Sequence, residues 1–99
     1  MGFFSMFGGT ENKYSNIEHQ LSELEINKLV SEITIKTLKQ GEEDLVEHTL
    51  LQRRHGDGKI SLRQIYESLT QLKNQHKISV YDRDGLIKVF ESYYATHKV

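Results

Sequence analysis

Residues 57–61 read Asp-Gly-Lys-Ile-Ser and join two segments that carry helical hydrophobic patterns. An Asp-Gly pair favours a tight turn. Ser61 and Gln64 have the spacing of a capping box, in which each side chain bonds to the backbone amide of the other residue. Ile60 and Ile65 flank this box as a hydrophobic staple would. The stretch therefore predicts a turn, a buried isoleucine and the start of a helix.

Two helices are predicted before this stretch. The first begins with the capping box Ser22-x-x-Glu25, continues with apolar residues at i, i+3, i+4 spacing and is expected to stop at Gly41. The second is expected to run from Glu42 to about Arg54. Its first turn is acidic, as the positive end of the helix dipole favours.

Two more helices are predicted after it. The first of them ends in the polar run 73–77. The last helix has two alternative starts. Either Ser79-x-x-Asp82 caps it at once, or Asp84 and Gly85 form a turn and the helix follows. Beyond either start, apolar residues recur at helical spacing towards the C-terminus.

These patterns predict an all-α fold, a compact four-helix domain with short connections. We place the helical domain at residues 16–99 and an N-terminal arm and linker at residues 1–15. The arm reads Met-Gly-Phe-Phe-Ser-Met-Phe-Gly-Gly. It is expected to be mobile, to fold back on the domain or to dock on a partner. The Lys-Ile-Ser segments at 59–61 and 77–79 are candidates for a two-strand bridge.

Size and composition limit the classes of protein to consider. The 99 residues suit one domain. The absence of cysteine excludes disulfides, thiolate zinc sites and cysteine nucleophiles, and the absence of proline permits uninterrupted helices. The net charge is −1, with an acidic first half and a basic second half. A charge asymmetry of this size is typical of a solvated domain surface.

Common catalytic motifs are absent from the sequence. It contains no Gly-x-x-x-x-Gly-Lys phosphate loop and no Gly-x-Ser-x-Gly elbow, and its five histidines lack metal-ligand spacing. No stretch approaches the roughly 18 apolar residues of a membrane helix. The N-terminus lacks the basic and long apolar regions of a secretory signal. We therefore expect a non-enzymatic, cytoplasmic protein with no cofactor and no transmembrane segment.

The two Asp-Gly junctions resemble the calcium loops of the EF-hand family. Such a loop has glycine at the sixth of twelve positions and oxygen ligands around it. With Gly85 at the sixth position, the third, fifth and twelfth positions are the candidate calcium ligands Asp82, Asp84 and Glu91. In the first junction, Arg53 takes the first ligand position and would repel the cation. The alternative, which we favour, is that Asp-Gly only turns the chain before a capped helix.

A second resemblance involves the junction at 57–61 and the phenylalanine-rich start at 1–9. Both features are similar to those of tellurite-resistance B-like domains. The resemblance is confined to these two features. We carry over no function to this chain from either family.

The favoured function is protein–protein interaction, as a small adaptor, regulator or immunity-like factor. Aromatic side chains dominate the cores of protein interfaces. The candidate partner-binding residues are therefore Phe3, Phe4, Phe7, Tyr81, Tyr93 and Tyr94. A degenerate EF-hand-like calcium module, with the three carboxylates above, is the first alternative.

A nucleic-acid-binding helical domain is the second alternative. Basic side chains gather around the 57–61 junction, where the candidate phosphate contacts are Arg53, Arg54, Lys59 and Arg63. The carboxylates expected on the last helix would repel phosphate there. Nucleic acid is therefore a less favoured partner than protein.

Overall fold

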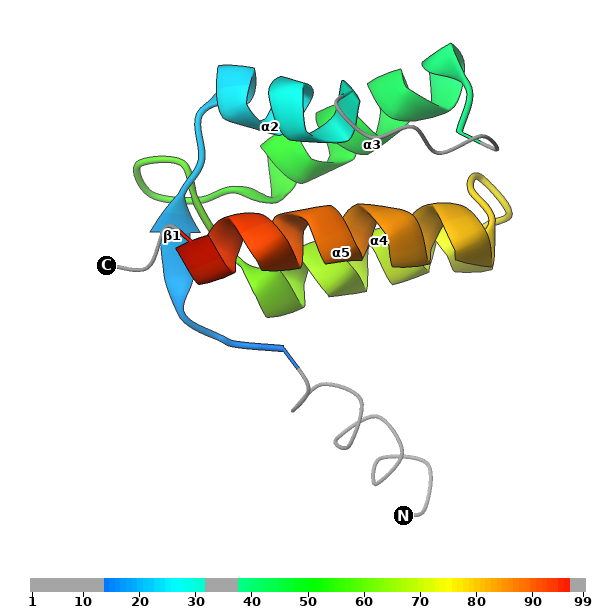
Figure 1. The fold of residues 1–99 in the computed structure, drawn as a ribbon. Coiled ribbons are helices and arrows are strands. Elements are labelled where there is room, and N and C mark those ends of the chain that lie inside the picture. The colour runs from blue at the N-terminus through cyan, green and yellow to red at the C-terminus, as the bar shows by residue number, and fades with distance from the viewer. Residues whose placement is uncertain (1–13, 32–37, 97–99) are drawn as a thin grey trace.

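The computed structural model describes residues 14–31 and 38–96, and over these ranges it forms four helices and a two-stranded sheet. In chain order the elements are β1 (Glu18–Gln20), α2 (Glu23–Ser31), α3 (Gln40–Arg53), β2 (Lys59–Ser61), α4 (Leu62–Asn74) and α5 (Val80–Thr96). The predicted compact four-helix domain is confirmed (Figure 1). Residues 1–13, most of the predicted arm and linker, lie outside the described residues.

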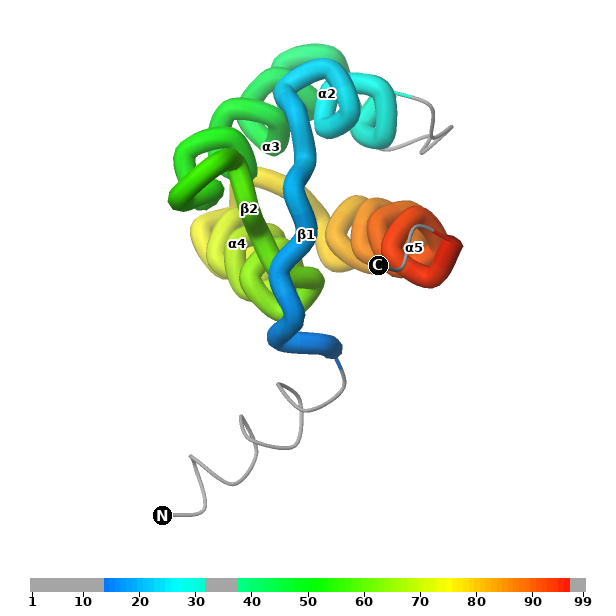
Figure 2. The backbone as a smooth tube through the Cα atoms, turned by 90° about the vertical axis from the view of Figure 1, so that its left-hand side faces the viewer, coloured from blue at the N-terminus to red at the C-terminus, as the bar shows by residue number. Residues whose placement is uncertain are grey.

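The helices form two layers that are joined along one side by the sheet. α2 and α3 make one layer, and the α4–α5 hairpin makes the other (Figure 1). β1 leads up to α2, and β2 returns from α3 to α4, so the strands lie side by side and antiparallel (Figure 2). Their register pairs Glu18 with Ser61, His19 with Ile60 and Gln20 with Lys59. The sheet therefore ties the two layers together.

The pairing of the second strand differs from the prediction. Lys59–Ser61 is a strand, but it pairs with Glu18–Gln20 rather than with residues 77–79. Within the latter segment, the Ser79 amide donates to Asp82 Oδ2 at 3.0 Å and the Ser79 hydroxyl accepts from the Asp82 amide at 3.0 Å. These bonds commit Ser79 to a helix start. β1 itself was missed because Glu-His-Gln has no apolar alternation.

Three helices begin with the same kind of capping box. In each, the serine amide donates to a side chain three residues later, and the serine hydroxyl accepts from that residue's amide. The pairs are Ser22–Glu25, Ser61–Gln64 and Ser79–Asp82, with distances between 2.8 and 3.1 Å. The first two were predicted, and the third confirms one of the two proposed starts of the last helix.

Two glycines that were considered as a helix stop or as a turn lie inside helices. Gly41 is the second residue of α3, and Gly85 lies within α5. The Lys39 amide donates to Glu42 Oε1 at 2.8 Å, so the cap of α3 lies before the glycine. A glycine in a helix costs only about 1 kcal/mol relative to alanine, which such capping can offset. The prediction that Gly41 stops the first helix was therefore wrong.

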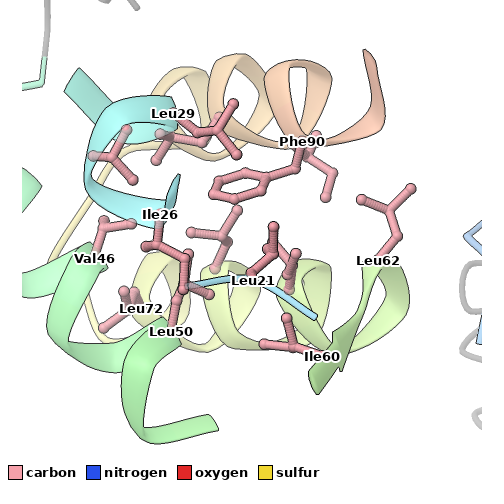
Figure 3. Packing of buried hydrophobic residues seen from close by; sticks show 14 of the residues in the cluster. Leu21, Ile26, Leu29, Val46, Leu50, Ile60, Leu62, Leu72 and Phe90 are labelled. Carbon is pink, nitrogen blue, oxygen red and sulfur yellow. The ribbon is translucent and has the colours of Figure 1, made fainter. Parts of the chain in front are cut away.

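One hydrophobic cluster fills the space between the two layers (Figure 3). The largest fully buried apolar side chains are Phe90, Leu21, Ile26, Leu50, Ile60, Ile65, Leu69 and Leu86. They come from all four helices, from β2 and from the segment between β1 and α2. The Phe90 ring points from α5 into the middle of the cluster (Figure 3). The layers thus share a single core.

The described helices also bear on membrane insertion. Across residues 14–31 and 38–96, none of the helices is both long enough and apolar enough to cross a bilayer. The longest of them, α5, has 17 residues and carries buried Asp82 near its start. The prediction of no transmembrane segment therefore holds for the part of the chain that the structure describes.

Candidate partner-binding groove

A groove of about 680 Å³ lies between α2 and α5. It is lined by Glu25, Lys28 and Leu29 of α2 and by Lys88, Val89, Ser92, Tyr93 and Thr96 of α5. Leu29 forms the buried bottom of the groove, and Val89 and Tyr93 are half-buried. The surface between these two helices is therefore apolar at its centre and reachable from solvent.

The groove follows from how the two helices present their apolar faces. α2 turns Ile26 and Val30 fully into the core, which leaves Leu29 at the edge of its apolar face. In α5 the buried face is formed by Leu86, Phe90 and their neighbours, and Val89 lies beside that face. Apolar side chains at the flanks of two neighbouring helices leave a partly solvated strip between them.

Two lysines flank the apolar strip. Lys28 of α2 and Lys88 of α5 are both exposed. Their aliphatic stems can extend the apolar surface while the ammonium groups stay in water. The groove therefore combines apolar side chains with two ammonium groups and the carboxylate of Glu25.

A hydrogen bond between half-buried side chains connects the groove walls. Tyr93 Oη donates to Glu25 Oε2 at 2.5 Å, and Glu25 Oε1 accepts from the Ser22 amide at 2.8 Å. The Glu25 carboxylate therefore joins the start of α2 to α5. The bond to Glu25, followed by burial and the charge of that carboxylate, raises the pKa of Tyr93 to about 12. The phenol is therefore a hydrogen-bond donor at neutral pH.

The neighbouring tyrosine serves the core instead of the groove. Tyr94 is buried, and its Oη donates to the Ile60 carbonyl at 2.7 Å. Its ring meets the His19 ring edge-on, with the centroids 4.7 Å apart. Burial, with smaller effects of Tyr93 and Glu25, raises the pKa of Tyr94 above its usual value. Tyr94 therefore fixes the sheet to α5 and is not available as a surface contact.

The other predicted aromatic contacts lie elsewhere. Tyr81 is 76% exposed in the first turn of α5, away from the groove. Phe3, Phe4 and Phe7 lie outside the described residues. Of the predicted partner-binding residues within the described ranges, the structure therefore places Tyr93 in the groove and separates it from Tyr81 and Tyr94.

The three candidate calcium ligands all lie on α5. Asp82 is buried and accepts from the Ser79 amide, whereas Asp84 accepts from Arg83 Nε at 3.0 Å. Glu91 stands nine residues after Asp82, or about 13 Å along a helix. Calcium holds its ligands at about 2.3–2.6 Å, so these two carboxylates cannot share one ion in this conformation. The segment that resembles a calcium loop lies in a helix that begins at the Ser79–Asp82 cap, so it forms neither a calcium loop nor the Asp-Gly turn that we favoured there.

The other acidic and histidine side chains of the described chain form no metal site either. Within residues 14–31 and 38–96, no three side chains of histidine, cysteine, aspartate or glutamate are grouped so that they could hold a metal ion. Calcium binding remains a prediction that a titration can test, and the geometry of α5 gives it no support.

The four candidate phosphate contacts have different surroundings, and they do not form one cluster of free cations in the described residues. Arg53 Nη2 bonds to Glu67 Oε1 at 2.9 Å, and Arg54 Nη1 donates to the Leu21 carbonyl at 2.8 Å. The Arg63 amide donates to the Ser15 carbonyl at 3.1 Å, and Lys59 is an exposed residue of β2. Arg53 and Arg54 therefore hold parts of this chain together, which limits their use for phosphate.

Sequence reasoning singled out Tyr93 but missed Val89 of the groove, and it missed the contacts that tie the sheet to the rest of the fold. Val89 was not singled out, although an apolar residue outside the main stripe of the last helix is a usable signal. No sequence pattern indicated the contacts of Leu21. Its partners Arg54 and Gly58 lie 33 and 37 positions further along the chain. Long-range bonds of this kind leave no local pattern.

Compared with known proteins, this chain matches no family model, no curated protein and no solved structure. Its function must therefore be argued from the groove and from the residues around it.

Proposed function

We propose that this chain is a small protein–protein interaction domain that acts as an adaptor or regulator in the cytoplasm and has no enzymatic activity of its own. Its partner binds in the α2–α5 groove. The observation that carries the proposal is the apolar strip of Leu29, Val89 and Tyr93, which two exposed lysines flank.

The chemistry of the strip suits a protein partner. Tyrosine is enriched at interface hot spots because its ring supplies apolar area and its hydroxyl supplies a hydrogen bond. Tyr93 lines the groove, and the bond from its hydroxyl to Glu25 holds the ring in place, so that it can supply apolar area to a partner. An open groove between helices is also the surface that receives amphipathic helices in several recognition modes. The surrounding four-helix core keeps the two walls in place.

A matched pair of variants tests the proposal. Val89→Lys places a charge in the groove, whereas Val80→Lys places the same charge at an exposed position of the same helix, 40% accessible and away from the groove. The full chain, Val89→Lys and Val80→Lys are used as baits in native lysate, and bound proteins are identified by mass spectrometry. We expect a partner that the wild type and Val80→Lys capture and that Val89→Lys loses.

Circular dichroism of each bait controls for folding. If Val89→Lys stays folded and captures the same proteins as Val80→Lys, the groove is not the contact surface. If enzymatic turnover were found at a site outside the groove, the non-enzymatic assignment would also fail.

A further inference from the structure

We propose that the aromatic segment Phe3–Phe7 of this same chain occupies the α2–α5 groove when no partner is bound. The inference goes beyond the proposed function, because it names an occupant that a partner must displace. Residues 1–13 lie outside the described residues, which begin at Tyr14.

The described chain begins next to the groove. Tyr14 is buried, and its ring lies 4.7 Å from that of Tyr66, centroid to centroid. Together with Lys88 and Glu91 of α5, Tyr14 lines a small polar recess on the α4–α5 side. Lys88 lines both this recess and the groove. The chain before Tyr14 therefore starts at α5, and the groove lies on the adjacent flank of that helix.

The intervening length of chain is sufficient. A helix with its side chains is about 10–12 Å across. Seven residue steps separate Phe7 from Tyr14, and an extended chain covers at most about 3.3–3.6 Å per step, or about 23 Å in all. Gly8 and Gly9 permit a turn in this connection. The phenylalanines can therefore reach the groove from Tyr14.

The segment and the groove are chemically matched. Residues 3–7 read Phe-Phe-Ser-Met-Phe and carry no charged side chain, which suits the apolar strip. Residues 10–13 read Thr-Glu-Asn-Lys, and the face of α5 that they would cross carries the exposed residues Asp84, Lys88 and Glu91. The apolar part of the segment thus meets the apolar part of the surface, and the polar part meets the polar part.

Tethering favours this occupant over a second copy. A short flexible connection gives an effective concentration of about millimolar, so even weak docking is populated intramolecularly. A second molecule at micromolar concentration competes at a disadvantage of about a thousandfold. A protein partner would have to bind strongly enough to displace the segment.

A spin label tests the proposal directly, because the chain has no cysteine. Ser5→Cys in the full chain carries a nitroxide between Phe4 and Met6. We expect the strongest loss of methyl NMR intensity at Leu29 and Val89, relative to the reduced label, and a weaker loss at Leu50 of α3. Val89→Lys should restore the Leu29 signal, whereas Val80→Lys should not.

A second variant separates docking from disturbance of the groove. Replacing Phe3, Phe4 and Phe7 by serine in the labelled chain leaves the described residues unchanged and should restore the signals of Leu29 and Val89. Equal broadening throughout the domain, or none at these two methyl groups, would overturn the proposal. A second measurement uses an equimolar mixture of spin-labelled chains and isotope-labelled chains without a spin label. Broadening of Leu29 and Val89 in this mixture would assign the groove to a second copy and would also overturn the proposal.

The two proposals fail in different ways. If Val89→Lys loses a captured partner but the spin label does not broaden Leu29 and Val89, the interaction function stands and the internal occupant is wrong. If broadening is found but capture does not depend on Val89, the groove is a packing site for the segment and the interaction function is wrong.

Discussion

The sheet side of the domain and the α2–α5 groove are held by different kinds of contact. On the sheet side, backbone groups accept or donate bonds to backbone and side-chain groups of distant segments. The Leu21 amide donates to the Gly58 carbonyl at 3.0 Å, the Leu21 carbonyl accepts from Arg54 Nη1 at 2.8 Å, and the Ile60 carbonyl accepts from Tyr94 at 2.7 Å. Such bonds fix the path of the chain.

At the groove, α2 meets α5 through the side chains of Glu25 and Tyr93. Both are half-buried, and rotation of Tyr93 can open the contact without breaking a bond to the backbone. One side of the fold is therefore held by several bonds to backbone groups, and the other by a bond between two side chains that a ligand can rearrange. Mutations can test this difference at matched positions.

The largest expected effect comes from paired truncations in the core. Ile60→Ala removes a fully buried side chain at the sheet and should lower the free energy of unfolding by about 3–5 kcal/mol. Leu29→Ala removes a side chain at the bottom of the groove, where solvent can fill the gap, and should cost only about 2 kcal/mol. Urea denaturation measures both. Equal costs would contradict the difference between the two sides.

Two glycines in the turn before β2 provide the next comparison. Gly58 has φ of +86°, and a Cβ there would lie 3.0 Å from Arg54 Nη1, whereas Gly56 has φ of +58° and open space around it. Gly58→Ala should cost about 2–3 kcal/mol, because it strains the backbone and disturbs the Arg54 bond to Leu21. Gly56→Ala should cost about 1 kcal/mol for its backbone conformation alone. Thermal unfolding of the two variants separates these contributions.

The adjacent tyrosines Tyr93 and Tyr94 allow the two sides to be compared by removing one hydroxyl group from each. Tyr94→Phe leaves the Ile60 carbonyl without its buried donor and should cost about 1–3 kcal/mol. Tyr93→Phe releases Glu25 at the groove, where water can replace the hydroxyl, and should cost about 0.5–1 kcal/mol. A larger loss for Tyr93→Phe than for Tyr94→Phe would show that the groove is the more firmly held side.

The pH dependence of the Tyr93 variant follows from its raised pKa. The folded state holds the proton more tightly than the unfolded state, so the stabilisation by this hydroxyl is complete below pH 10 and falls as the pH rises towards 12. The difference in stability between wild type and Tyr93→Phe should therefore be constant from pH 7 to 9 and shrink above pH 10. If the stability difference between wild type and Tyr93→Phe is already lost when the pH is raised from 7 to 9, the bond to Glu25 is not its source.

Local features of the fold were predictable from the sequence. The serine capping boxes at Ser22 and Ser61 and the apolar stripes after them depend on residues three or four positions apart. These interactions are present whatever the rest of the chain does. The four helices and their approximate starts could therefore be derived without coordinates.

Glycine was a poor guide to where helices begin and end. Gly41 and Gly85 lie inside helices because caps upstream of them start α3 and α5. The end of α4 has a left-handed residue where glycine is usual, but this residue is His76, with φ of +61°. The amide of Lys77 bonds to the Leu72 carbonyl at 2.9 Å there. Backbone hydrogen bonds, rather than residue type, determine these positions.

The candidate site was only partly predictable for a geometric reason. Successive residues of a helix point about 100° apart, so Tyr93 and Tyr94 face different surroundings although they look equivalent in the sequence. Which of them reaches solvent depends on where α2 and β2 pack. The partner of Tyr93, Glu25, is 68 residues away, and no local pattern reports such a distance.

The smallest expected effect concerns the other flank of α2, where it meets α3. Burial, followed by the charges of Asp44, Glu43 and Glu23, raises the pKa of Glu47 above its ordinary value of 4.5. The folded state therefore disfavours the charged form, and this cost appears as the pH rises through 4.5 and persists at neutral pH. Glu47→Gln should stabilise the domain by about 0.3–0.5 kcal/mol at pH 7 and leave it unchanged at pH 3. Glu91→Gln, an exposed change on α5, should do neither, and equal shifts in the melting temperature of both variants would point to net charge instead of repulsion at α2.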